Sequence, residues 1–80
     1  MKLAPGAAAA RALGRLQIAL GQAERAVTEL EAAARLAPDS PEIWFVLAQA
    51  HTRAGRKEAA AHARAEFLRL EKLRTPLNTP

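Results

Sequence analysis

The side chains most capable of chemistry are two histidines, His51 and His62, and the only serine, Ser40. A catalytic serine needs a base that a third group holds in place, whereas Ser40 stands directly before Pro41, as a residue that caps a helix does. Gly55 separates the histidines into different segments, and neither joins acids at metal-ligand spacing. There is also no cysteine and no glycine-rich phosphate loop. The sequence therefore predicts no enzyme, no metal site and no cofactor.

The distribution of charged and apolar residues argues against a nucleic-acid or membrane partner. The chain has 80 residues and a net charge of +4. Its basic residues form no contiguous run, and one tryptophan and two phenylalanines offer no platform for stacked bases, so we expect no nucleic-acid partner. No apolar run approaches the roughly 20 residues of a membrane span, so we expect no membrane partner. We also expect a cytoplasmic location.

Alanine, leucine, arginine and glutamate dominate the chain, and these residues favour helices. Residues of similar type recur 34 positions apart without a gap, in the pairs Gly21 and Gly55, Leu13 and Leu47, Gly14 and Ala48, and Ala26 and Ala60. The period divides the chain into units 7–40 and 41–74, preceded by a lead 1–6 and followed by a disordered tail 75–80. Glycine in each unit favours a tight turn, which predicts helices over 7–20, 22–36, 41–54 and 56–74.

The period and these residues resemble the tetratricopeptide repeat, whose pattern is Trp-x2-Leu-Gly-x2-Tyr, then Ala-x3-Phe, then Pro. The second unit matches through Trp44, Leu47, Ala48 and Ala60. The first matches through Leu13, Gly14, Ala26, Leu30 and Pro38. The resemblance implies an all-α fold of two helix-turn-helix hairpins stacked as a short α-solenoid, with Trp44, Leu13 and Leu47 in the core. It also implies a scaffold that binds another protein or peptide.

The resemblance further implies a partner-binding concave face, made by the first helix of each hairpin. By the repeat register this face carries Arg11, Arg15, Ile18, Phe45, Gln49, Thr52 and Arg53, with Ala8 and Glu42 beside them. Because arginine matches carboxylates, we expect an acidic partner segment. Phe45 could seat one apolar side chain.

The second unit departs from the family pattern at Arg64, where an aromatic is usual, and at Lys72, where the connector proline is usual. Both changes suggest the C-terminal end of a repeat array, with an extended last helix. His51 replaces a packing aromatic, which predicts a half-buried structural histidine, and His62 is expected at the surface.

An alternative function is a self-assembling structural unit, a homodimer without a dedicated peptide groove. Repeats usually need three or more units to bury a continuous core, and this chain has two. Surplus apolar residues fall outside the predicted core at both ends of the chain. They are Leu3 in the lead, Leu16 and Leu20 on the first helix, and Ala61, Ala65, Leu68 and Leu73 on the last.

Overall fold

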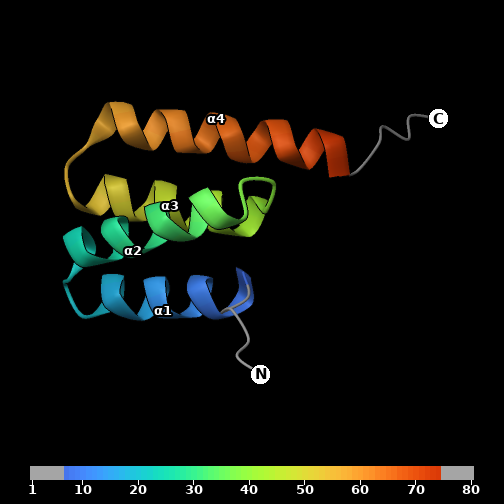
Figure 1. The fold of residues 1–80 in the computed structure, drawn as a ribbon. Coiled ribbons are helices and arrows are strands. Elements are labelled where there is room, and N and C mark those ends of the chain that lie inside the picture. The colour runs from blue at the N-terminus through green and yellow to red at the C-terminus, as the bar shows by residue number, and fades with distance from the viewer. Residues whose placement is uncertain (1–6, 75–80) are drawn as a thin grey trace, which may run out of the picture.

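The computed structural model describes residues 7–74 of the protein, with side chains from residue 9 to residue 73. This range forms four α-helices, α1 (Ala7–Ala19), α2 (Ala23–Leu36), α3 (Pro41–Arg53) and α4 (Lys57–Arg74), as Figure 1 shows. Residues 7–74 contain no strand. The all-α prediction is confirmed, and each predicted helix differs from the observed one by a single residue at one end. The predicted lead 1–6 and tail 75–80 lie outside the described residues.

The turn inside each hairpin depends on a glycine in the left-handed region. Gly21 has φ 78° and Gly55 has φ 80°, a conformation that costs glycine little. In the first hairpin the Gln22 amide donates to the Gln17 carbonyl at 2.7 Å, and in the second the Arg56 amide donates to the His51 carbonyl at 2.8 Å. These bonds, 34 residues apart, satisfy the helix-end carbonyls. The repeat in sequence is therefore also a repeat in backbone geometry.

The connector between the hairpins ends where α3 begins. Ser40 occupies the N-cap position and Pro41 the first turn of the helix, as the sequence predicts. The Ser40 hydroxyl, however, donates to a carboxylate oxygen of Glu42 at 3.2 Å and makes no capping bond to a backbone amide. The proline at the first helical position thus starts α3 with its φ already set for a helix.

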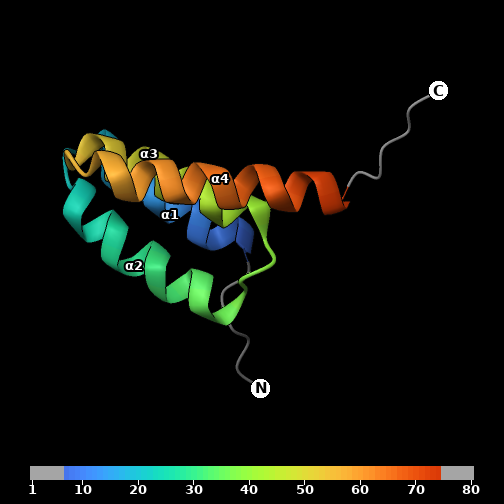
Figure 2. The same cartoon turned by 90° about the horizontal axis from the view of Figure 1, so that it is seen from above.

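Helix α3 is the centre of the stack. It contacts α1, α2 and α4, whereas α4 contacts only α3 among the described helices. Figure 1 shows the four helices side by side, and Figure 2 shows α2 set apart from α1, α3 and α4. This arrangement leaves one face of the stack bounded by α1, α3 and α4 alone.

The core lies where α2 meets α3. Its largest fully buried side chains are Val27 and Leu30 from α2 and Ile43 and Val46 from α3. Gly14 on α1 packs against Leu30 so closely that a Cβ there would lie 2.8 Å from Leu30 Cδ1. A small residue at position 14 therefore allows α1 to approach α2.

Two residues that the sequence places in the core are less buried than predicted. Leu13 is 46% exposed, because no described segment covers its side of α1, whereas Leu47 at the equivalent position of α3 is only 3% exposed, beneath α2. Trp44 is half-buried at the edge of the core, and its indole N–H donates to the Pro38 carbonyl at 2.9 Å. An indole at the edge keeps its polar N–H bonded to the connector, as this side chain requires.

The close approach at Gly14 gives a first prediction. Gly14→Leu should destabilise the protein by about 1–3 kcal/mol through overpacking, although leucine favours a helix over glycine by up to about 1 kcal/mol. Ala61→Leu, at an exposed position of α4, is the control and should change stability little. Urea denaturation followed by circular dichroism measures both; equal effects would contradict the packing at Gly14.

The core assignment gives a second prediction. Leu30→Ala should cost about 2–5 kcal/mol, because the side chain is 1% exposed and its removal leaves a cavity. Trp44→Ala should cost less than Leu30→Ala, because the half-buried indole already contacts water. The same denaturation experiment measures the free energy of unfolding of both variants. A larger loss of stability for Trp44→Ala than for Leu30→Ala would contradict this assignment of the core.

Candidate peptide-binding groove

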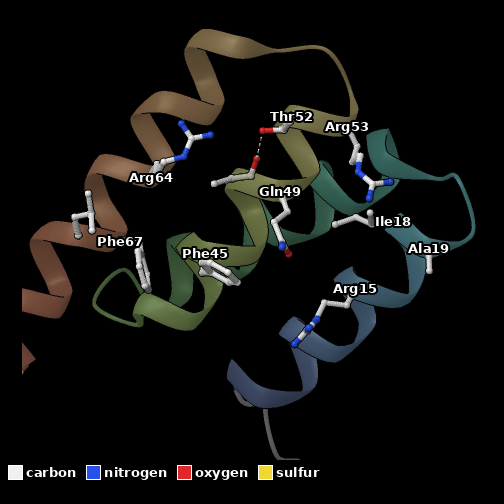
Figure 3. A pocket seen from close by; sticks show the side chains of 11 residues that line it. Arg15, Ile18, Ala19, Phe45, Gln49, Thr52, Arg53, Arg64 and Phe67 are labelled. Carbon is white, nitrogen blue, oxygen red and sulfur yellow. Dashed lines mark hydrogen bonds between the residues drawn. The ribbon is translucent and has the colours of Figure 1, made fainter.

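The face bounded by α1, α3 and α4 is hollowed. A cavity of about 610 Å³ opens there, and Figure 3 shows its side chains converging from the three helices. Its lining residues are Arg15, Ile18, Ala19, Phe45, Ala48, Gln49, Thr52, Arg53, Arg64, Phe67 and Leu68. We refer to this cavity as the groove.

Six of the seven predicted site residues line the groove: Arg15, Ile18, Phe45, Gln49, Thr52 and Arg53. The seventh, Arg11, is half-buried and does not line it, and neither does the neighbouring Glu42; the side chain of Ala8 lies outside the described residues. The sequence prediction missed the wall that α4 supplies, with Arg64, Phe67 and Leu68. It assigned the face only to the first helix of each hairpin, although Arg64 already stood out as a departure from the repeat pattern.

The charge of the groove has one sign. Arg15, Arg53 and Arg64 come from three different helices, and no acidic side chain lines the cavity. Among the described residues none of these arginines makes an ion pair or hydrogen bond, whereas Arg56 pairs with Glu24 at 2.5 Å. Three unpaired guanidinium groups around one cavity attract carboxylates, since each presents a fork of N–H donors.

Two phenylalanines form the apolar part of the groove. Phe45 from α3 and Phe67 from α4 have ring centroids 5.2 Å apart and planes tilted by 49°. Phe45 is 43% exposed. A partly exposed aromatic pair beside unpaired arginines can bind an apolar side chain while the arginines bind its charged neighbours.

Polar side chains separate the aromatic pair from Arg53. The Thr52 hydroxyl donates to the Ala48 carbonyl at 2.9 Å, the dashed line in Figure 3. Gln49, one turn before Arg53, is exposed within the cavity. A side-chain amide offers both a donor and an acceptor, so Gln49 is able to bond the backbone of a segment lying along the groove.

The histidines lie outside the groove, along a second hollow of about 570 Å³ between α2, α3 and α4. His51 is 4% exposed, more buried than predicted, and its Nε2 lies 3.6 Å from Glu31 Oε2. Burial lowers the pKa of His51 from 6.5, against the opposing effect of the Glu31 carboxylate; Arg56 and His62 lower it further. His62 is exposed, as predicted, and meets the edge of Trp44 with ring centroids 6.1 Å apart.

Residues 7–74 contain no group of three or more histidine, aspartate or glutamate side chains placed to hold a metal ion. Within the same range, no helix combines the length and the apolar character that crossing a membrane requires.

A stack of helix hairpins whose turns repeat at a fixed spacing defines an α-solenoid repeat protein. The sequence profile of the tetratricopeptide repeat family matches residues 11–70, and the chain belongs to that family. Tetratricopeptide repeats are non-catalytic scaffold folds that generally act as protein–protein interaction modules. No curated protein and no solved structure matches the chain.

The burial of His51 predicts how stability depends on pH. Because its pKa is lower in the folded chain than the ordinary 6.5, the unfolded chain binds a proton more readily, so the free energy of unfolding should fall as pH decreases below 6.5. His51→Gln, which places the residue of the equivalent position 17, should flatten this dependence. Denaturation midpoints between about pH 7.5 and 5.5 measure it.

His62→Gln is the matched control, because His62 is an exposed histidine one helix away. This variant should keep most of the pH dependence of the parent protein, because His62 is the smallest of the influences on the pKa of His51. If His62→Gln flattened the profile and His51→Gln left it intact, the effect would not come from the buried imidazole.

Proposed function

We propose that the protein binds an acidic, extended segment of a partner protein in the groove between α1, α3 and α4. The observation that carries this proposal is the set of three unpaired arginines, Arg15, Arg53 and Arg64, around a cavity without an acid. Concave sites with a few convergent polar groups are the usual places where ligands bind. The family's general role in protein interaction supports the same conclusion.

The groove also defines the pattern of the partner segment. Carboxylates that meet the arginines would flank an apolar side chain that lies on the Phe45 and Phe67 pair. Gln49 lies between Phe45 and Arg53 on α3 and is free to bond the segment's backbone. Because the guanidinium groups are partly exposed, salt should screen their attraction for the segment.

A direct test uses a fluorescently labelled peptide of alternating glutamate and leucine, with the same peptide carrying lysine in place of glutamate as its counterpart. Anisotropy should show binding of the glutamate peptide only, weakened as salt rises from about 50 to 500 mM. Arg15→Glu should weaken binding about tenfold or more, because it replaces an attraction with a repulsion.

Arg25→Glu is the matched control. It makes the same charge change at an exposed position of α2, outside the groove, so it should weaken binding much less than Arg15→Glu. Equal losses for the two variants would mean that only net charge matters, and tighter binding of the lysine peptide would overturn the proposal.

A self-assembling unit without a peptide groove is the second candidate function. It is favoured by the exposed leucines Leu13 and Leu16 of α1 and Leu20 just after it, which lie outside the groove. The groove and these leucines are separate surfaces, so self-association does not require the groove to be absent.

A further inference from the structure

The side of α1 that faces away from the groove has no charged residue. Leu13, Leu16 and Leu20, the last just beyond the end of the helix, are 46%, 55% and 63% exposed. Residues at this spacing lie on one side of a helix. Arg11 and Arg15, the charged residues of α1, lie about half a turn away, on the opposite side. We call the surface of Leu13, Leu16 and Leu20 the leucine face.

The repeat shows what kind of element fits the leucine face. At the equivalent positions of α3, Leu47 is 3% exposed and Ala50 is fully buried. Helix α2 covers that side of α3, with Leu30 and Ala34 in the shared core. The leucine face is the same side of the preceding repeat, and no described helix covers it. Its shape and composition therefore suit a packed helix.

We infer that the leucine face binds the leucine face of a second copy of this chain, in a twofold dimer. Charge favours this occupant. Each chain carries a net charge of +4, so two copies associate most readily through a surface free of charge. At the other end of the stack Arg64 lies beside Leu68, and α1 has no acidic residue to meet it, which disfavours head-to-tail stacking.

The leucine spacing also fits a twofold axis. Two α1 helices can pack antiparallel with the twofold axis passing between residues 16 and 17. Leu13 of one copy then lies opposite Leu20 of the other, and the two Leu16 side chains meet near the axis. A hollow of about 320 Å³, lined in part by Ala9, Ala10 and Leu13, opens beside this position. Ala10, which stands where the second repeat has Trp44, is a small side chain that leaves space in this hollow. The second copy's Leu20 can fill part of it.

The size of the leucine face sets the strength of the dimer. Helix α1 has 13 residues and is therefore about 20 Å long at 1.5 Å per residue. One helix pair buries less than the roughly 1,200 Å² of a standard interface, so the dimer is weak, with a dissociation constant of about 10–100 μM. Arg15 lies on the other side of α1, so each copy keeps its groove open.

Sedimentation of the full chain over a dilution series from about 1 μM to 1 mM tests the dimer across its expected dissociation constant. Leu16→Lys should raise the dissociation constant about tenfold or more, because it brings two ammonium groups together near the axis. Leu68→Lys is the matched control. Leu68 is 54% exposed against 55% for Leu16, but lies at the opposite end of the stack, so this variant should dimerise like the parent. Circular dichroism checks that both variants remain helical.

A second measurement tests the dimer without placing a lysine on the leucine face. The chain has no cysteine, so Leu16→Cys introduces a single thiol, and mild oxidation should link Leu16→Cys into a covalent dimer much faster than Leu68→Cys. A parent that stays monomeric to about 1 mM would overturn the proposal, since even weak interfaces associate at that concentration. Faster cross-linking of Leu68→Cys than of Leu16→Cys would also overturn the proposal, and so would weaker dimerisation of Leu68→Lys than of Leu16→Lys. Either result would place the contact on α4. None of these outcomes affects the peptide test of the groove.

Discussion

The contact between α2 and α3 is the packing on which the other features of the structure depend. Val27 and Leu30 bury themselves against Ile43 and Val46, and this contact joins two hairpins that could not each bury a hydrophobic face alone. Leu30 also fixes the approach of α1, since the space beside Gly14 admits no Cβ without movement of Leu30. Helix α3 therefore holds α1, α2 and α4 in place, and the groove forms on the side of this stack from which α2 is absent.

Two residues at the same repeat position can differ in burial between the two units. Each unit packs against the other on one side only, so a position that is buried in one unit can be exposed in the other. Leu30 is buried in the core of the first unit, whereas Arg64, 34 residues later, is exposed on the groove. Leu47 is buried beneath α2, whereas Leu13, 34 residues earlier, is exposed. A charged residue would be costly to bury at the first position. At the second position no described helix covers Arg64, which stays exposed and gives the groove a third guanidinium group.

The sequence was sufficient to predict the helices, the turns and most of the groove, because a gap-free period fixes which residues share a face. Gly21 and Gly55 mark both turns, and the repeat register alone places Arg15, Phe45 and Arg53 on one face. Prediction from the sequence was wrong where the burial of a side chain depends on a neighbouring repeat unit. Repeat position alone assigned Leu13 to the core, although no described helix covers it. The contribution of α4 to the groove was also missed, because a repeat motif describes a unit inside an array, where the next helix would cover that wall.

The two proposed surfaces use opposite sides of α1, and this division has a consequence for binding. Arg15 faces the groove while Leu16, the next residue, lies on the leucine face, since neighbouring helix residues point about 100° apart. A twofold dimer through the leucine face would therefore carry two open grooves related by the same axis. A partner with two acidic segments would bind the second groove intramolecularly, at an effective concentration set by the linker between its segments. Dimerisation and partner binding would then favour each other, because a partner that spans both grooves also holds the two copies together.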